Sequence, residues 1–305
     1  MENLHEAYNS RPTDRNKLDT EMPPYYEMSI WKFIKSLFQN SEITKFTTPI
    51  IFNEPLTFLQ RNFEIMEYEN MLYKASICQD AHERMKFITS FVVSQHSYND
   101  KRLRKCFSSV SGETFEYQSK DGWIGLAEQI SHNPSKSVYH MESETYKIYG
   151  SNHTYFSFKG THMNIKPNTR QIIYLKKFNE KYKISGITLN VRNLLYGKKW
   201  IDIYCSFSNF TLQLNRNWNE LLKILPPTDS RLRKDVRYFE LGQMDKSENM
   251  KSIYERNENK KHEHKLAWFI HNHKSNSDEL NEPKWIIDYE YYKRNWKKCK
   301  NLFRQ

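Results

Sequence analysis

The spacing of hydrophobic and polar positions changes along the chain and divides it into three parts. Residues 1–27 are polar, contain three prolines and have no repeating apolar face, so we predict a flexible segment. From residue 28 the apolar positions fall at helical spacing, which predicts a short amphipathic helix over 28–38 and further helices over 53–98. From Trp123 the period falls to two, which is typical of β-strands.

Three helices are expected between residues 53 and 98. Asn53 followed by Pro55 is typical of an N-cap and a first helical turn, and two more helices are predicted over about 67–77 and 81–98. Apolar stripes at this spacing usually face a core. The stripe residues are Leu56, Leu59, Phe63 and Met66 in the first helix, and Met85, Ile88, Phe91, Val92 and Gln95 in the third.

The second half of the chain predicts an antiparallel sheet within residues 113–214. Its β-rich segments are 137–141, 145–150, 153–159, 171–178, 181–189, 199–207 and 209–214. A meander of this length must close into a barrel or cover its edges, because an open edge invites aggregation. After it we predict a C-terminal region of loop and helices over 225–305. This region begins with an extended loop that presents Asp229, Arg231 and Arg233, and continues with a charged helix from Asp245 to about residue 265.

The stretch 128–140 carries more polar groups than an ordinary buried strand. Pro134 forbids a continuous helix or a central ladder position, so the stretch predicts a strand that ends in a constrained turn. A turn that presents His132 and Lys136 can hold an anion.

Composition narrows the class of protein. The 305 residues suffice for one large domain, and aromatic residues at 15% with only 8 glycines favour a folded β or α+β protein. No run approaches the ~18 apolar residues of a membrane span, and the first residues lack a secretory signal, so we expect a cytosolic protein. A net charge of +11 favours an anionic partner, and without a nucleic-acid motif we expect an anionic membrane surface rather than nucleic acid.

Zinc binding and nucleophilic catalysis are two alternatives to the binding of an anion. His262, His264, His271 and His273 form two His-x-His pairs that on strands could bind zinc, but solvated surface histidines are the stronger interpretation. Ser131 beside His132 suggests a nucleophile and a base, yet neighbours on a strand point to opposite faces. The sequence has no glycine-rich phosphate loop and no dinucleotide fingerprint. We therefore predict no enzyme, no metal and no cofactor.

Several motifs, in the same order, resemble the oxysterol-binding protein family. Residues 128–135 are similar to its Glu-Gln-Val-Ser-His-His-Pro-Pro fingerprint, residues 49–61 to Pro-Val-x-Phe-Asn-Glu-Pro-Leu-Ser-x-Leu-Gln-Arg, and residues 225–235 to Leu-Pro-Pro-Thr-Asp-Ser-Arg-Leu-Arg-Pro-Asp. The resemblance covers residues 28–303. It implies one lipid-binding domain over 28–305 with an α+β fold, in which an antiparallel β-barrel encloses a lipid tunnel. The helix over 28–38, with Ile30, Trp31 and Ile34, would be its N-terminal lid.

The resemblance also implies a site for a lipid headgroup. Its positions here are Lys105, Ser108, His132, Asn133, Lys251, Glu255 and Asn259. Ser108 stands where the family has asparagine, Asn133 where it has histidine, and Asn259 where it has arginine. The missing arginine alone removes a charge-assisted contact of roughly 1.5–3 kcal/mol. These substitutions argue against tight phosphoinositide binding.

A shortened sheet leaves two functions open. Only residues 201–224 separate the Gly-Lys-Lys-Trp segment at 197–200 from the motif at 225–235, where the family has a long run of strands. The barrel is then incomplete, or closed by a partner or a second copy, or the chain is a short paralogue or splice form. The first hypothesis is a cytosolic carrier that docks transiently on membranes and transfers a sterol or phospholipid, with phosphatidylinositol 4-phosphate as the exchanged lipid. The alternative is a regulatory or interaction protein that transfers no lipid and keeps a degenerate site.

Overall fold

A computed structural model gives the fold of a large part of the chain. It describes residues 50, 53–95, 105–119, 121–158, 163–167, 170–185, 189–192, 200–202, 225–258, 264–271, 285–300 and 302–303. The predicted flexible segment 1–27, the predicted lid with Ile30, Trp31 and Ile34, and the predicted strand 209–214 lie outside these residues.

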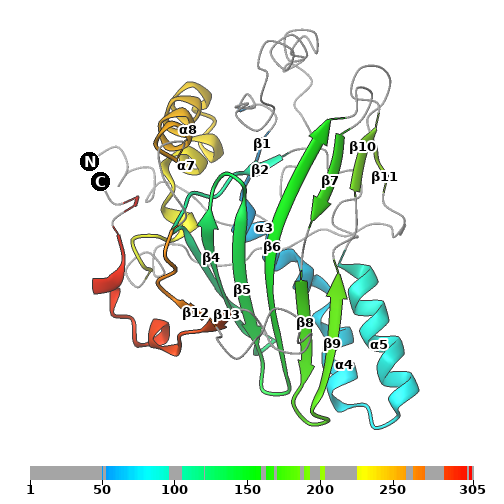
Figure 1. Cartoon of the computed structure of the whole chain (residues 1–305). Coiled ribbons are helices and arrows are strands. Elements are labelled where there is room, and N and C mark those ends of the chain that lie inside the picture. Colours follow the sequence, from blue (N-terminus) through cyan, green and yellow to red (C-terminus); the bar gives the residue numbers. More distant parts are fainter. Residues whose placement is uncertain are drawn as a thin grey trace.

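Helices lie at the two ends of the described chain, and most of the strands lie between them (Figure 1). In the N-terminal part these are β1 (Asn53–Thr57), α3 (Phe58–Asn62), the 3₁₀ helix η4 (Phe63–Tyr68), α4 (Glu69–Ile77) and α5 (Ala81–Ser94). The strands that follow are β2 (Lys105–Phe107), β3 (Thr114–Gln118), β4 (Ile124–Ser131), β5 (Lys136–Glu142), β6 (Tyr146–Phe158), β7 (Met163–Pro167), β8 (Arg170–Leu175), β9 (Glu180–Ser185), β10 (Leu189–Arg192) and β11 (Trp200–Asp202). The C-terminal part contains η6 (Ser230–Leu232), α7 (Lys234–Glu240), α8 (Met244–Glu258), β12 (Phe269–His271), β13 (Trp285–Ile287), η7 (Tyr289–Lys293) and η8 (Trp296–Lys298).

Nine strands form one antiparallel sheet that branches at β6. Its main path runs in the order β11-β10-β7-β6-β5-β4-β3. The first half of β6 pairs with β8, which pairs in turn with β9, and the second half of β6 pairs with β7. Within the described strands the sheet is branched and no pairing joins β3 to β11, so closure of the predicted barrel stays a prediction.

Strand β6 corrects the predicted break between segments 145–150 and 153–159. Gly150 and the polar residues after it were interpreted as a separator, but one strand runs through them. A Cβ atom at Gly150 would lie 2.5 Å from the ring of Tyr139 on β5. The glycine therefore admits a neighbouring aromatic ring and does not end the strand.

The first predicted helix starts four residues later than expected. Residues Asn53–Thr57 form β1, which pairs with β2 in parallel, and Thr57 is the N-cap of α3. The Thr57 hydroxyl accepts from the backbone N–H of Gln60 at 3.3 Å, and the Gln60 side chain accepts from the Thr57 N–H at 2.8 Å. This reciprocal capping box satisfies two helix-terminal donors, which Asn53 does not do.

The predicted helical stripes mostly face the core. Leu59, Phe63 and Met66 are buried between the helices and one face of the sheet, and Phe63 packs edge-on against Phe115 with ring centroids 4.9 Å apart. Met85 was expected in the stripe of α5, but 49% of it is exposed, so that assignment was wrong. Helix α5 ends at Ser94 with Gln95 as its C-cap, and residues 96–98 of the predicted helix lie outside the described residues.

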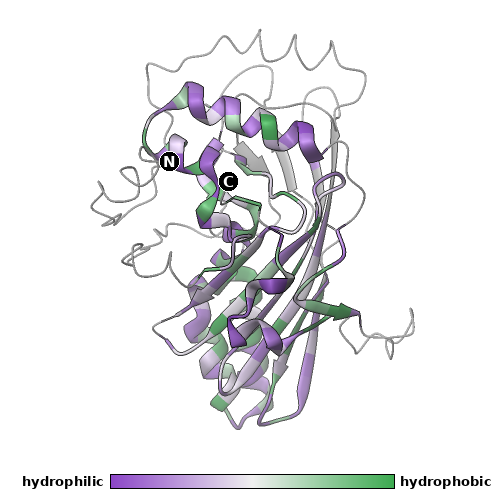
Figure 2. Ribbon diagram, turned by 90° about the vertical axis from the view of Figure 1, so that its left-hand side faces the viewer, coloured by the Kyte–Doolittle hydropathy of each residue, from purple (hydrophilic) through white to green (hydrophobic). Residues whose placement is uncertain are grey.

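The C-terminal part differs from the predicted extended loop in two ways. Asp229, Arg231 and Arg233 are buried around η6, because each arginine pairs with a carboxylate inside the fold. The region also contains strands β12 and β13, which form an antiparallel hairpin where only loop and helices were expected. Figure 2 shows this hairpin as a mainly apolar arm that projects from the rest of the molecule.

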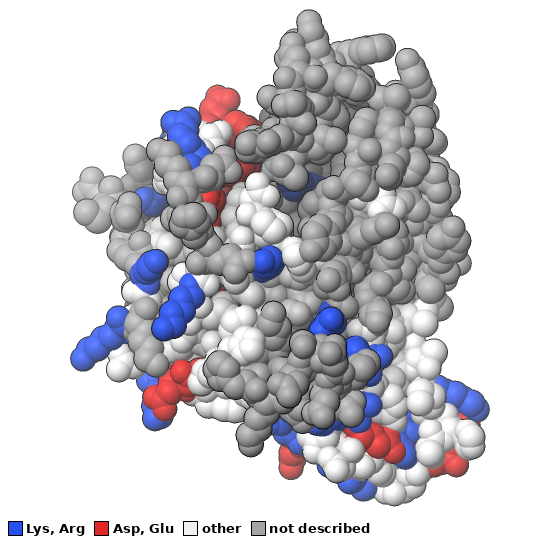
Figure 3. All heavy atoms as spheres, in the orientation of Figure 1, with Lys and Arg blue, Asp and Glu red and all other residues white. Residues whose placement is uncertain are grey.

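Charged side chains tie the C-terminal segment to the sheet. The carboxylate of Glu142, at the end of β5, accepts hydrogen bonds from His140, Lys176 and Tyr289 and forms an ion pair with Lys147. In Figure 3, further lysine and arginine side chains gather along the edge of the molecule where the C-terminal segment runs. Among the helices that the structure describes, none has the length and apolar character needed to cross a membrane.

Candidate functional site

Most of the predicted headgroup residues surround one loop, residues 108–112, between β2 and β3. Lys105 lies on β2, and Ser108 begins the loop. His132 and Asn133 lie in the turn between β4 and β5, and Lys251 and Glu255 lie on α8, while Asn259 is outside the described part of the chain.

The turn after β4 has the constrained form predicted from its sequence. The Nε2 of Gln129 donates to the Ser131 carbonyl at 2.7 Å and to the Ser135 hydroxyl at 3.1 Å. The Asn133–Pro134 peptide bond is cis. Gln129 thus holds the two sides of the turn together from inside the sheet.

His132 is oriented by the loop that it faces. Its Nδ1 lies 2.9 Å from the Ser109 carbonyl oxygen, and because a carbonyl can only accept, Nδ1 is the protonated nitrogen. Nε2 is then an acceptor in the neutral ring and a donor in the protonated ring. His132 is partly exposed and Asn133 is exposed, so both can meet a ligand from the solvent side.

Buried ion pairs fix the loop from below. The Glu113 carboxylate accepts from the Ser109 hydroxyl at 3.1 Å, the Val110 N–H at 2.9 Å and Arg233 at 2.9 Å. Arg233 also donates to the Ser108 carbonyl at 2.7 Å and pairs with both oxygens of Asp235. A buried charge is tolerated only when it is paired and hydrogen-bonded, and this set of contacts meets that condition.

Sequence reasoning missed this ionic cluster. Glu113 lies 120 residues from Arg233 in the chain, and the motif at 225–235 shows only charged residues after two prolines. One feature of the sequence could have indicated the cluster: an arginine and a carboxylate stand two residues apart twice in this motif. These pairs are Asp229 with Arg231 and Arg233 with Asp235. That signal does not distinguish a buried cluster from a solvated loop.

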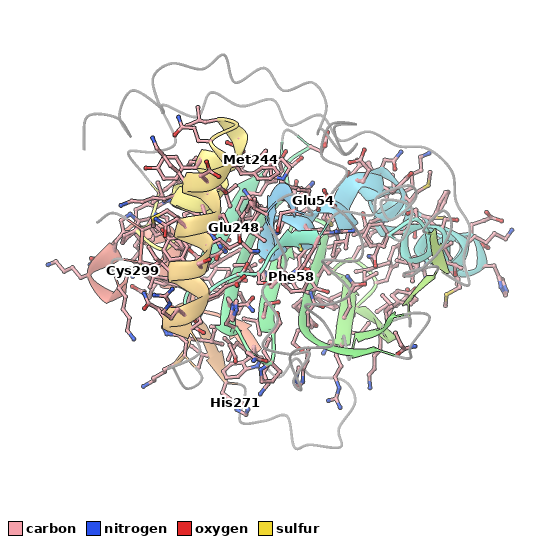
Figure 4. All side chains as sticks on the ribbon, turned by 90° about the horizontal axis from the view of Figure 1, so that it is seen from above. Glu54, Phe58, Met244, Glu248, His271 and Cys299 are labelled. Carbon is pink, nitrogen blue, oxygen red and sulfur yellow. The ribbon has the colours of Figure 1, made fainter. Side chains whose placement is uncertain are left out.

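Helix α8 is anchored at both ends and presents Lys251 between the anchors. Near its start, the Ser247 hydroxyl donates to the Asp235 carbonyl at 2.7 Å and Glu248 accepts from the Ile50 N–H at 2.5 Å. Near its end, Glu258 accepts from the Ser111 N–H at 3.0 Å. Figure 4 shows Glu248 on the side of α8 that faces β1.

Lys251 is the most constrained cation of the candidate site. Its side chain is 2% exposed, and the nearest carboxylate oxygen of Glu255 is 3.9 Å away. Burial lowers the pKa of Lys251 against the opposing effect of Glu255 and Glu248, and the positive charge of Lys105 lowers it further.

Asn53 does not have the role that the sequence predicts for it. It was assigned as an N-cap, but it lies on β1 with Lys105 as its register partner on β2. The side chain is 0% exposed, and among the described residues neither Nδ2 nor Oδ1 has a hydrogen-bond partner. A buried amide without partners is costly, and such groups are often kept for a ligand.

The histidine pairs do not form a metal site in the part of the chain that is described. His264 lies 3.3 Å from a Glu128 carboxylate oxygen, and the His271 ring packs against Trp285 at 5.0 Å. His262 and His273 lie outside the described residues, within which no three histidine, cysteine or acidic side chains come together as metal ligands would.

The chain belongs to the oxysterol-binding protein family. The family model, described as "Oxysterol-binding protein", matches residues 29–206 and 203–297. The two matched segments meet within the stretch 201–224 where the sequence predicts missing strands. This position agrees with a shortened chain, and the loss of strands stays a prediction.

Particular relatives are the human oxysterol-binding protein-related proteins 1 and 2. The first is 35% identical over 193 residues, which are 62% of this chain and 20% of the relative. The second is 34% identical over 193 residues, which are 62% of this chain and 40% of the relative. The match thus spans well under half the length of these relatives.

Solved structures show the fold of nearly the whole chain. The Osh3 ORD from Saccharomyces cerevisiae, in complex with PI(4)P, matches with a TM-score of 0.73 and 21% identity over 95% of this chain and 98% of that chain. The Osh1 ORD in complex with cholesterol matches with a TM-score of 0.74 and 21% identity over 95% of this chain and 94% of that chain. At this identity the likeness concerns the fold alone.

Proposed function

We propose that this protein binds a sterol or phospholipid and transfers it between membranes. The observation that carries the proposal is the polar site around loop 108–112, in a chain of this family. Lys105, His132 and Lys251 come from three separate elements: β2 leads directly into the loop, and the other two elements hydrogen-bond to it through His132 itself and through Glu258 of α8. Such rigid placement is what a binding site requires, because ordering the side chains then adds little cost to binding.

The ligand's headgroup carries little net charge in this proposal. The charge of Lys251 is opposed by the carboxylates of Glu248 and Glu255, and Asn133 replaces a histidine of the family. A phosphate monoester with two negative charges needs more positive charge than this balance supplies. PI(4)P is bound in the Osh3 structure, whereas cholesterol is bound in the Osh1 structure. For this chain we propose a neutral or singly charged lipid as the main ligand, with phosphatidylinositol 4-phosphate bound weakly as the exchanged lipid.

The free energy for carrying a lipid between membranes comes from burying the apolar surface of the lipid inside the protein. A lipid body removed from water gains about 25 cal/mol per Å² of apolar surface, so a closed cavity can hold a lipid outside a bilayer. We propose that residues 28–38 act as the lid and that the protein works in the cytosol, in transient contact with anionic membrane surfaces. No covalent step is involved.

Bound lipid in the purified protein is the first test. Protein purified from eukaryotic cells would be analysed by mass spectrometry, together with the double variant Lys105→Ala, His132→Ala. A matched control, Lys74→Ala, His82→Ala, removes the same residue types from exposed positions on α4 and α5. We expect stoichiometric lipid in the wild type and the control, and loss of any phosphoinositide from the site variant. Empty protein that also takes up no lipid from liposomes contradicts the proposal.

A second function is favoured by the family match, which falls into two segments that overlap at residues 203–206. If the sheet is shortened there, the chain would act as a regulatory or interaction protein and not as a carrier. Transfer of a fluorescent sterol between two vesicle populations distinguishes the two functions. Bound lipid without transfer would favour the regulatory function.

A further inference from the structure

The hairpin of β12 and β13 has one face buried and one face open. Phe269 and Ile287 are directly opposite each other and are buried against a cluster that includes Trp268 and Tyr291. The Asp288 N–H donates to the Trp268 carbonyl at 2.7 Å, which extends the pairing beyond the strands. The base of the hairpin is therefore rigid.

The outer face of the hairpin is unusual for a protein surface. Ile270 and Ile286 are opposite each other and are 57% and 44% exposed. A strand with one buried face normally carries polar residues on the other face. Here the face opposite the buried one carries two isoleucines, which are paired with each other in the strand register. Tyr289, two residues after the hairpin, is also exposed, at 51%.

The rest of the molecule holds the hairpin firmly to the sheet. The Glu128 carboxylate on β4 accepts from the N–H groups of Ala267 and Trp268 at 2.7 and 2.9 Å. On the other side of the hairpin, Arg294 pairs with Glu116 of β3. Because both flanks are fixed, the isoleucines cannot turn inward without breaking buried contacts.

The size of the exposed patch indicates what can cover it. Ile270, Ile286 and Tyr289 are three exposed side chains, whereas a stable protein interface involves roughly 20–30 residues on each partner. A bilayer needs no complementary shape and can accept two aliphatic side chains alone. Tyrosine and tryptophan are enriched at the level of lipid headgroups, and the segment 285–300 contains both.

The charge of segment 285–300 indicates a bilayer with anionic lipids. Residues 285–300 contain five lysines and arginines; Lys293 pairs with Glu290 and Arg294 with Glu116, which leaves three lysines for an anionic surface. Figure 3 shows cationic side chains gathered along the edge where this segment runs. Each cation near an anionic leaflet contributes about 1 kcal/mol.

We propose that the β12–β13 hairpin docks the protein on anionic membranes by inserting Ile270 and Ile286 into the headgroup region. The hairpin lies away from α7 and α8, so docking there is separate from the candidate headgroup site (Figure 1). The proposal rests on the proposed function in one respect, because a lipid carrier must reach a bilayer.

Vesicle flotation tests the proposal directly. Wild type and the double variant Ile270→Ser, Ile286→Ser would be compared on phosphatidylcholine vesicles with and without about 30% phosphatidylserine. The control, Ile77→Ser, Ile253→Ser, changes two exposed isoleucines on α4 and α8. We expect the hairpin variant to lose at least about tenfold in partitioning onto the anionic vesicles, while the control stays within twofold of wild type.

Several results would overturn the proposal. These are absence of wild-type binding to the anionic vesicles, equal loss in the hairpin and control variants, or a hairpin variant that changes only the oligomeric state in light scattering. Melting curves check that the variants fold. Sterol delivered from cyclodextrin separates docking from lipid binding. The hairpin variant should take up this sterol normally and fail only with vesicles, whereas failure with both donors in the wild type contradicts the proposed function itself.

Discussion

Asn53 offers a direct test of whether the region around Lys105 is built for a ligand. Its side chain is fully buried and has no hydrogen-bond partner within the part of the chain that the structure describes. Each unsatisfied buried polar group costs roughly 1–3 kcal/mol, and an apolar side chain of similar shape removes this cost. Leucine matches asparagine in branching, although imperfect packing offsets part of the gain. We therefore expect Asn53→Leu to raise the free energy of unfolding by about 1 kcal/mol or more and to weaken lipid binding at least fivefold.

The same substitution at a hydrogen-bonded asparagine supplies the control. The Asn62 side-chain oxygen accepts from Asn152 at 2.9 Å. Asn62→Leu should lower the free energy of unfolding by about 1 kcal/mol, because the partner on β6 loses its acceptor. Urea denaturation measures the free energy of unfolding of both variants. Equilibrium binding of a fluorescent sterol measures their lipid binding. A destabilised Asn53→Leu protein, or a stabilised one with unchanged lipid binding, refutes the assignment of this amide to a ligand.

Two further predictions concern the ionic contacts that hold the fold. Burial would raise the pKa of Glu142, but its four hydrogen-bond donors outweigh this and hold the pKa well below its usual range. Glu142→Gln should therefore cost roughly 1–3 kcal/mol at pH 7, with the deficit fully present above about pH 5 and shrinking as the pH falls below about 4. A deficit in urea denaturation that stays constant from pH 7 to pH 3 would contradict this. Arg233→Met should cost about 3–5 kcal/mol because it leaves Glu113 and Asp235 buried and unpaired, whereas Arg256→Met on the exposed face of α8 should change stability by less than about 0.5 kcal/mol. Similar costs for the two arginine variants would refute the role of the buried cluster.

Local features of the sequence predicted the turn between β4 and β5 well. Pro134 restricts the backbone, and the alternating positions on either side of it indicate strands, so neighbouring residues alone determine this element. The helical stripes through Leu59 and Ile88 were predicted for the same reason. Each of these signals acts over fewer than ten residues.

Long-range contacts explain what the sequence did not predict. Gly150 resembles a strand breaker until the Tyr139 ring from the adjacent strand is placed over it. Arg233 resembles a solvated residue until Glu113, far away in the chain, is brought beside it. The start of the first helix was predicted wrongly for a local reason. Both Asn53 and Thr57 can cap a helix, and the capping box forms at Thr57.

A shortened sheet and a well-held headgroup site are compatible in this protein. The contacts that hold loop 108–112 come from residues before the predicted deletion, such as Gln129 and His132, and from residues after it, such as Arg233 and Glu258. The predicted loss of strands lies between these groups, in residues 201–224. Shortening there would affect the walls that enclose the lipid body and would leave the anchors of the polar site in place. We therefore expect the two proposed functions to differ in how long a lipid is retained, with the polar site kept in both.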